Sequence, residues 1–291
     1  MKDSKKLEKE FFDFVKERQK IWYNRFILNK NFPWTRDETL KKFKIINMYR
    51  ELDRCTQYLI KKLKDIKDRK KILMNVVFYR FFNLNNLYEM LDVEVLDKID
   101  SENLIKKFDL LKRTGPIFNN AYLISSGTKG KPKHIEIIEN LERMSFRELV
   151  NGIDKSKTPE ESFEVIEKIP LVGPFLACEI WTDLTYFNFF RRRWTDDDFV
   201  NIGPGAKWGL EIIYGKLKKK KLYEKLKYLY NIQKDFLDNK RWKKIAYKES
   251  FSNYPFLSIT NIEGALCEFR KYHRLKDGLG KKRYFKIKKF L

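Results

Sequence analysis

The 291-residue sequence has few of the residues that build disulfide frameworks and metal centres. It contains three cysteines and two histidines. Cys55, Cys178 and Cys267 lie far apart and form no Cys-x-x-Cys pair. This spacing argues for a reducing compartment and against structural zinc or an iron–sulfur loop. We therefore expect no metal and no cofactor.

Long apolar runs are also missing. No stretch approaches the roughly 18 residues that a membrane-spanning helix needs. The first ten residues are mostly charged, unlike a signal peptide. The sequence therefore predicts a soluble, cytoplasmic protein without a membrane partner.

Glycine and proline are scarce, at 12 and 8 residues, and alternating strand patterns are rare. Apolar residues instead recur at three- and four-residue spacing, which is typical of helices that bury one face. The sequence therefore predicts an all-α fold. The expected helices cover residues 7–28, 39–64, 69–82, 134–149, 159–169, 174–187, 221–237 and 262–274.

Positive charge is in large excess. Lys and Arg number 63 against 40 Asp and Glu, which gives a formal net charge of +23 and a sequence pI near 9.7. Because the excess is spread along the chain, we expect it on the folded surface, where it attracts polyanions such as nucleic acid. A lysine-rich source organism would give the same composition without DNA binding, so charge alone leaves the partner open.

The run Ile169–Ala177 is the most informative stretch. A strong helix start, Thr158-Pro159-Glu160-Glu161, precedes it, a tight turn ends at Gly173, and a second helix begins at Pro174. A helix, a short hairpin and a second helix turn backbone N–H groups outward at a helix N-terminus, which is a favourable place for a phosphate oxygen. A Pro-x-x-Gly turn also joins helices in many proteins that bind no DNA.

Three consecutive carboxylates, Asp196, Asp197 and Asp198, lead into a Gly-Pro-Gly turn and a further helix. They can cap that helix, or one of them can stabilise a developing cation on a deoxyribose and orient a nucleophile. We take Asp198 as the candidate catalytic residue, with Asp197 and Asp196 as rivals. No histidine supports a metal site here.

Hairpin and carboxylate together resemble the helix-hairpin-helix DNA glycosylase superfamily. The spacing of 25 residues from Gly173 to Asp198 is slightly long, and Leu171 stands where that family usually has its first glycine. The resemblance implies two helical lobes with a DNA-binding cleft. The residues that we expect to contact DNA are Val172, Gly173, Phe175, Arg191, Arg192, Arg193, Lys129 and Lys131.

A second resemblance is more specific. The stretches 47–58, 115–125, 194–210 and 262–274, in that order, are similar to the alpha-glutamyl/putrescinyl thymine pyrophosphorylase family. That family is also described as the helical domain attached to 5-hydroxymethyl-deoxyuridine DNA kinases, and is held to derive from the helix-hairpin-helix glycosylase fold. The candidate pocket or cleft residues are Arg50, Asp53, Arg54, Tyr79, Arg80, Asn119, Trp194, Asn201, Trp208 and Glu268.

This second resemblance covers residues 40–285, with the hairpin at 159–184, and implies one glycosylase-like unit over residues 1–291. Its members act on 5-substituted pyrimidines in phage DNA, so the expected partner is double-stranded DNA that contains modified pyrimidines. The oligomeric state stays open.

For the reaction, we predict a monofunctional DNA glycosylase that flips out the modified base, cleaves its N-glycosidic bond and acts in antiviral defence. Phe175 stands where bifunctional glycosylases carry a Schiff-base lysine, which implies an intact abasic site as product. Two alternatives remain: a hypermodification transferase that joins an amino acid or polyamine to an activated thymine methylene, and a non-enzymatic DNA-binding module.

Overall fold

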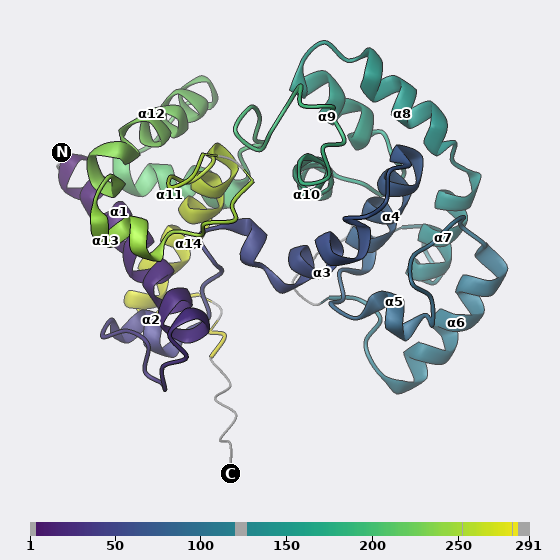
Figure 1. Ribbon diagram of the computed structural model, residues 1–291, viewed down its shortest axis with the longest axis horizontal. Helices are drawn as coiled ribbons and strands as arrows, with labels where there is room; N and C mark the ends of the chain where they lie inside the picture. The colour runs from purple at the N-terminus through teal and green to yellow at the C-terminus, as the bar shows by residue number, and fades with distance from the viewer. Residues whose placement is uncertain (1–3, 120–126, 252, 281, 285–291) are drawn as a thin grey trace. The chain divides into compact units, whose positions relative to one another are not determined.

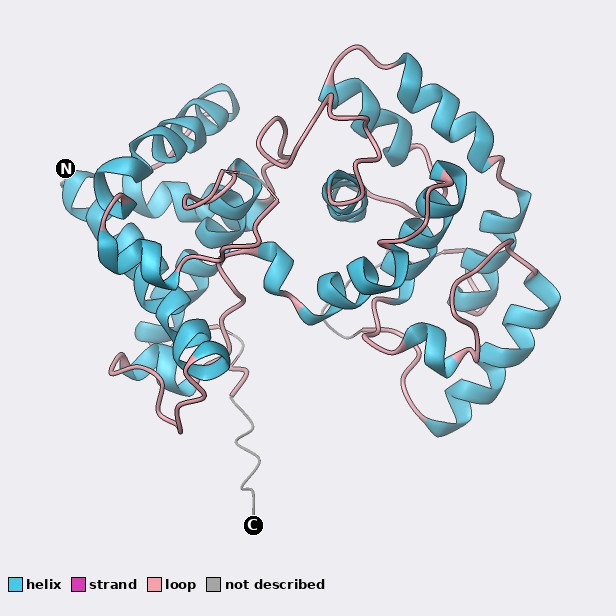
Figure 2. Ribbon diagram, in the orientation of Figure 1, coloured by secondary structure: helices cyan, strands magenta, loops and turns pink. Residues whose placement is uncertain are grey.

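A computed structural model describes residues 4–119, 127–251, 253–280 and 282–284. Helices dominate these ranges, and no β-strand occurs within them (Figure 1, Figure 2). One isolated bridge pairs Phe43 with Tyr284. The predicted all-α class is therefore confirmed for the described ranges. None of their helices combines the length and the apolar character of a membrane span.

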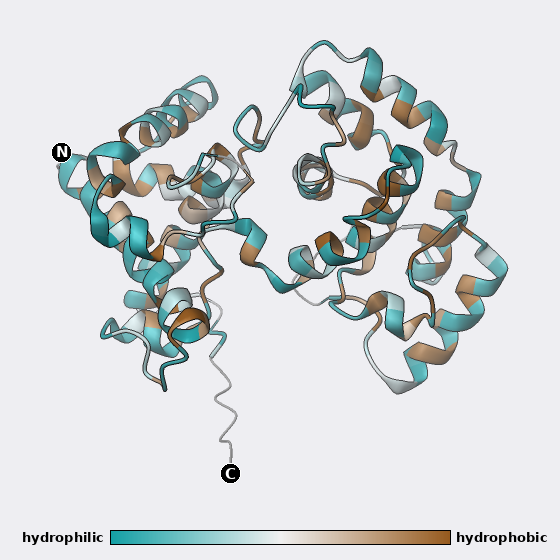
Figure 3. Ribbon diagram, in the orientation of Figure 1, coloured by the Kyte–Doolittle hydropathy of each residue, from teal (hydrophilic) through white to brown (hydrophobic). Residues whose placement is uncertain are grey.

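The chain divides into two compact units. Residues 1–53 and 202–291 form the first unit, and residues 54–201 form the second. Polar and apolar residues alternate along the helices of each unit, as expected for helices that bury one side (Figure 3). The expectation of one glycosylase-like unit over residues 1–291 stays a prediction.

The first unit packs its N-terminal and C-terminal helices together. Aromatic rings join them: the centroids of Phe11 and Phe269 lie 5.4 Å apart, and those of Phe14 and Tyr272 lie 5.0 Å apart. The helices of this unit are α1 (Ser4–Trp22), α2 (Glu38–Lys42), α11 (Pro204–Tyr214), α12 (Lys219–Leu237), α13 (Lys240–Ile245) and α14 (Ile259–Lys276), with a π-helical turn η1 (Tyr23–Ile27) and a 3-10 turn η2 (Arg50–Leu52).

The second unit encloses one large hydrophobic core. Its central helix α4 is almost wholly buried and packs against α10, which carries the buried Trp181. The helices of this unit are α3 (Arg54–Leu63), α4 (Arg69–Phe82), α5 (Leu87–Met90), α6 (Ser101–Thr114), α7 (Lys133–Arg143), α8 (Phe146–Lys155), α9 (Pro159–Glu167) and α10 (Pro174–Thr185).

The prediction of one continuous helix over 39–64 is wrong. The chain leaves α2 at Phe43 in extended conformation, forms η2, and starts α3 only at Arg54. The backbone N–H of Lys44 donates to the carbonyl of Arg283 at 2.7 Å, and the side chain of Asn47 accepts a hydrogen bond from Arg18 at 2.8 Å. These contacts with distant parts of the chain replace the helical hydrogen bonds.

The prediction of a single helix over 134–149 is also wrong, because one helix ends before Met144 and another begins after Ser145. The Ser145 hydroxyl accepts the N–H of Glu148 at 3.3 Å and thereby caps a new helix, α8. The helices α5, α6 and α13 were not predicted. The helices predicted at 159–169, 174–187, 221–237 and 262–274 are confirmed to within three residues at each end.

Candidate functional site

The hairpin between α9 and α10 has the predicted form. Thr158 caps α9 through a hydrogen bond from the N–H of Glu161 at 3.1 Å. The turn closes through the N–H of Val172, which donates to the carbonyl of Ile169 at 3.0 Å. Leu171 has a φ of +65°, a left-handed conformation that costs a non-glycine residue about 1–2 kcal/mol. The conformation explains why glycine would be the usual residue at this position.

The hairpin residues differ in what they expose. The Val172 side chain is buried in the core and its N–H is used within the turn, so we assign Val172 to packing instead of DNA contact. Gly173 is the N-cap of α10 and offers no capping side chain, while Phe175 is 54% exposed on the first turn. The outward surface is therefore made of the Gly173 backbone, Pro174 and the Phe175 ring.

The acidic turn is held by its own hydrogen bonds. The Asp198 carboxylate accepts the backbone N–H of Thr195 at 2.7 Å and its hydroxyl at 2.9 Å. Asp196 is buried, and the N–H of Asp197 donates to the Thr195 hydroxyl at 3.2 Å. The contacts of Asp198 are those of a side chain that stabilises a turn.

Phe199 joins this turn to the hairpin helices. Its ring lies 5.1 Å from Phe163 of α9 and 5.3 Å from Trp181 of α10, measured between centroids. The Asn201 amide donates to the carbonyl of Pro174 at 3.5 Å, which is the long limit for a hydrogen bond. The structure thus brings together the hairpin and the acidic turn.

The three consecutive arginines have different roles. Arg193 donates to the carbonyls of Ile153 at 3.1 Å and Ser156 at 3.0 Å, and so caps the C-terminus of α8. It also stacks on Trp194, with its guanidinium carbon 4.3 Å from the ring centroid. Arg191 and Arg192 are exposed, with left-handed φ values of +54° and +63°. We therefore assign Arg193 and Trp194 to structure, and Arg191 and Arg192 stay candidates for DNA contact.

Asp154, in α8, forms an ion pair with Arg69, the first residue of α4. Arg69 binds it through two hydrogen bonds of 2.8 and 2.7 Å, and Arg193 lies 3.8 Å away. The hydrogen bonds from Arg69 lower the pKa of the Asp154 carboxyl, although its partial burial acts in the opposite direction. The ion pair fixes the C-terminus of α8 against α4.

Two of the proposed pocket residues lie in the interior of the second unit. Tyr79 is fully buried, and the Arg80 guanidinium is 1% exposed. Arg80 binds both carboxylate oxygens of Asp183, one of them at 2.7 Å, together with Asn83 at 3.0 Å and Thr56 at 2.9 Å. These contacts make Arg80 a structural link between α4 and α10.

The remaining candidates of the second unit lie at its surface or against its loops. Arg54 is exposed, and Asn119 donates to the carbonyl of Asn83 at 2.9 Å. Lys131 forms an ion pair with Glu139 at 2.6 Å, whereas Lys129 is exposed. Residues 120–125 of the stretch 115–125 that carries the family resemblance lie outside the described residues.

The candidates of the first unit are mostly structural. Glu268 is buried and accepts the N–H of Ile46 at 3.0 Å. The N–H of Arg50 donates to the Asn261 side chain at 2.8 Å, so Arg50 belongs to η2 and not to a continuous helix face with Arg54. Asp53 is exposed, and Trp208 is 43% exposed.

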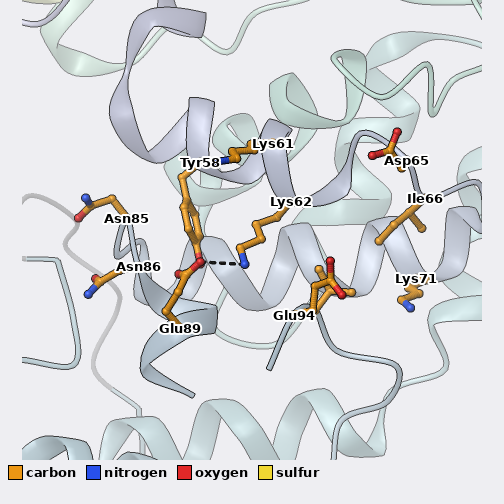
Figure 4. A pocket seen from close by; sticks show the side chains of 11 residues that line it. Tyr58, Lys61, Lys62, Asp65, Ile66, Lys71, Asn85, Asn86, Glu89 and Glu94 are labelled. Carbon is orange, nitrogen blue, oxygen red and sulfur yellow. Dashed lines mark hydrogen bonds and ion pairs between the residues drawn. The ribbon is translucent and has the colours of Figure 1, made fainter. Parts of the chain in front are cut away.

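A cavity of about 630 Å³ on the second unit was not predicted (Figure 4). Tyr58 and Lys62 from α3 face Glu89 from α5; the Tyr58 hydroxyl donates to Glu89, and the Lys62 ammonium lies 2.8 Å from it. Burial and the contact with Glu89 raise the pKa of Tyr58. The cavity is lined by Tyr58, Lys61, Lys62, Asp65, Ile66, Lys71, Asn85, Asn86, Glu89, Glu94 and Val95.

The lining of this cavity contains equal numbers of acidic and basic side chains, so it suits a polar neutral ligand better than a phosphate. Its residues come from separate helices that only the tertiary structure brings together, and no local sequence pattern marks them. Within the described ranges, no cluster of three or more His, Cys, Asp or Glu side chains could hold a metal ion.

Comparison with known proteins identifies relatives of this chain. Residues 5–281 match the family model described as "5-hmdU DNA kinase, helical domain". A "5-hmdU DNA kinase" of Bacillus phage SP10 is 29% identical over 287 residues, an alignment that covers 90% of this chain and 44% of the relative. The chain thus spans less than half the length of that relative. No solved structure matches.

These findings overturn the predicted reaction. The family and the relative are named for a kinase, an enzyme that transfers a phosphoryl group, so the predicted glycosylase and the amine-transferring alternative are wrong. The alternative of a non-enzymatic DNA-binding module stays a prediction. Hydrolysis and antiviral defence have no support, and descent from the helix-hairpin-helix glycosylases stays a prediction. With 277 of its residues matched, the chain belongs to the family of 5-hmdU DNA kinase helical domains.

Proposed function

We propose that this chain takes part in the phosphorylation of 5-hydroxymethyl-deoxyuridine in DNA, and that it supplies the part that binds the DNA. The observation that carries the proposal is the family match over residues 5–281. The net charge of +23 supports a polyanionic partner.

The hairpin supports the DNA-binding part of the proposal. The N-terminus of α10 carries the positive end of a helix dipole, and Gly173 lets a phosphate approach the backbone without meeting a side chain. Arg191 and Arg192 are exposed in the same unit and add charge without sequence preference. In this proposal these groups bind the DNA backbone, and other residues recognise the modified base.

Phosphorylation of the hydroxymethyl group requires a different conformation of the DNA from cleavage of the N-glycosidic bond. The substituent on C5 of thymine points into the major groove of B-DNA. Because the group is accessible in the groove, its oxygen can attack the γ-phosphoryl group of a nucleoside triphosphate while the base stays paired. The bond to the diphosphate breaks, and the diphosphate and the hydroxyl proton are released. Attack on the N-glycosidic bond requires base flipping, whereas the proposed phosphorylation does not.

A Gly173→Asp variant separates DNA binding from folding. Aspartate is a favourable N-cap, and a carboxylate suits the helix dipole, so the melting temperature should not fall. The same carboxylate would repel a phosphate, and we expect the affinity for duplex DNA to fall about tenfold or more. Gly115→Asp is the matched control, because a Cβ at Gly115 would meet no atom within 4 Å and the charge change is the same.

The substrate is tested with two duplexes that differ only in one base, 5-hydroxymethyluracil or thymine. We expect tighter binding of the first duplex, measured by fluorescence anisotropy. Equal affinity for both duplexes would reject the proposed function.

A further inference from the structure

A small groove lies at the start of α11 in the first unit. Its volume is about 350 Å³, within the range of about 300–1,000 Å³ that is typical of small-ligand sites. It is lined by Ile202, Gly203, Pro204, Lys207, Trp208, Lys219 and Leu222. The groove therefore combines an aromatic ring, two ammonium groups and the backbone of a helix N-terminus.

Trp208 is the aromatic wall of this groove. It is 43% exposed, although tryptophan is usually highly buried. The Arg270 guanidinium from α14 covers its ring, with the guanidinium carbon 3.8 Å from the ring centroid. Such stacking holds the indole in a fixed orientation while much of the side chain stays accessible to a second planar group.

The cations around the ring have little acidic compensation. Within the described residues, neither Lys219 nor Arg270 has a carboxylate within 4.0 Å, and Lys207 lies at that limit from Glu211. Burial, and then repulsion from Arg274, lower the pKa of Arg270. The nearby Glu263 carboxylate accepts the N–H of Gly203 at 3.1 Å. An anion bound in the groove would supply a counter-charge to Lys207 and Lys219.

We propose that this groove binds a nucleotide, with the base stacked on Trp208 and a phosphate held by Lys207 and Lys219. A ligand that satisfies both features must carry a planar ring and an anionic group a few ångströms apart, which describes a nucleotide. Stacking platforms flanked by cations bind bases of any sequence, because every base has a π-face. The ligand is either an unpaired nucleotide of a DNA strand or a free nucleotide.

The site is independent of the hairpin and of the proposed phosphorylation. It lies in the first unit, whereas the hairpin lies in the second, and it needs no modified base. Binding of unmodified nucleotides therefore tests it even if the chain proves to have no part in phosphoryl transfer.

The test uses the full chain and four variants, one of which is Trp208→Phe, which keeps an aromatic ring at position 208. Trp208→Ala removes the stacking ring, Lys219→Ala removes a groove cation, and Lys227→Ala removes an exposed cation from the same helix, α12, outside the groove. The probes are fluorescein-labelled oligo(dT), ATP and dTMP, with affinity measured by anisotropy or equilibrium dialysis. Thermal unfolding of each variant checks that it is folded.

We expect Trp208→Ala and Lys219→Ala to weaken binding about tenfold, Trp208→Phe to restore part of it, and Lys227→Ala to change it less than about twofold. An effect on oligo(dT) alone identifies a strand nucleotide, and an effect on ATP or dTMP identifies a free nucleotide. Unchanged binding by folded Trp208→Ala, or an equal loss in both lysine variants, would overturn the inference.

Discussion

The Arg80 guanidinium lies inside the second unit, where Asp183, Asn83 and Thr56 bind it. Removing one partner of a buried ion pair leaves an uncompensated charge, which costs about 3–5 kcal/mol. Glu179 lies 3.7 Å from the Arg80 guanidinium and keeps part of the compensation. We therefore expect Asp183→Asn to lower the free energy of unfolding by less than this amount, as measured by urea denaturation.

The double variant Arg80→Met with Asp183→Leu is the control, since it removes both charges and keeps similar volume. It should be closer in stability to the wild type than Asp183→Asn is. Equal destabilisation of the two variants would show that the contacts of Arg80 with Asn83 and Thr56 matter more than its charge.

The Asp154–Arg69 pair predicts a pH dependence. The folded pKa of Asp154 is lowered below its unfolded value near 3.9, so its contribution is present above about pH 4 and is lost as the pH falls through the folded pKa. We expect Asp154→Asn to be less stable than the wild type at pH 7, and the difference in stability to shrink as the pH falls below about 4. A stability difference that does not change over this range would contradict the assignment.

Arg192 links backbone strain to DNA binding. It is exposed with a φ of +63°, and glycine at such a position removes about 1–2 kcal/mol of strain while losing about 0.4–1 kcal/mol through the unfolded state. We expect Arg192→Gly to be at least as stable as the wild type, yet to bind DNA more weakly, with a salt slope reduced by about one.

Asn188→Gly is the matched control, because Asn188 is exposed, uncharged and left-handed at a φ of +49°. It should leave the salt slope unchanged. If both variants keep full DNA affinity, Arg192 makes no phosphate contact, and another cause for its strained backbone is needed.

At the level of helices, the contact between α11 and α14 depends on a glycine. A Cβ at Gly209 would overlap the carbonyl oxygen of Leu266 and lie 2.8 Å from its carbonyl carbon. Gly264, within α14, would meet no atom within 4 Å. We expect Gly209→Ala to lower the free energy of unfolding by roughly 2 kcal/mol or more, and Gly264→Ala to raise it by about 0.5–1 kcal/mol.

Both substitutions place alanine in a helix interior, so helix propensity favours both equally. A difference in melting temperature between them therefore measures the close approach of the two helices. If the two variants had the same stability, α11 and α14 would have to be further apart than the structure shows.

Local signals decided which helices could be predicted. Thr158 and Pro159 mark the start of α9, and Pro174 marks the start of α10. Each of these residues favours a helix start through contacts or geometry within the first helical turn, so the sequence alone reveals it. The break between α2 and α3 could not be predicted, because it depends on contacts of Lys44 and Asn47 with distant residues. The left-handed Leu171 was also outside sequence reasoning, since its side chain gives no reason to expect that φ.

At the level of the molecule, the first unit is assembled from both ends of the chain. No sequence pattern predicts that residues 1–53 pack with residues 202–291, because the apolar faces of helices do not specify their partners. For the same reason Arg80 and Glu268 appeared as cleft residues, although both are buried in contacts with distant residues. The hairpin was predictable because its chemistry lies within one short segment.

The net charge of +23 allows backbone contacts to be distinguished from base recognition. Each phosphate that the protein neutralises contributes about −0.9 to the slope of log K against log salt concentration. If the hairpin, Arg191, Arg192 and Lys129 each contact one phosphate, the slope should be about −3.6. We expect the same slope for duplexes with thymine and with 5-hydroxymethyluracil, because both present the same backbone. The affinity at each salt concentration should differ, because the hydroxymethyl group adds hydrogen bonds that release no counterions. A flat salt dependence would rule out backbone binding, and two different slopes would mean that the modified base changes which phosphates are held.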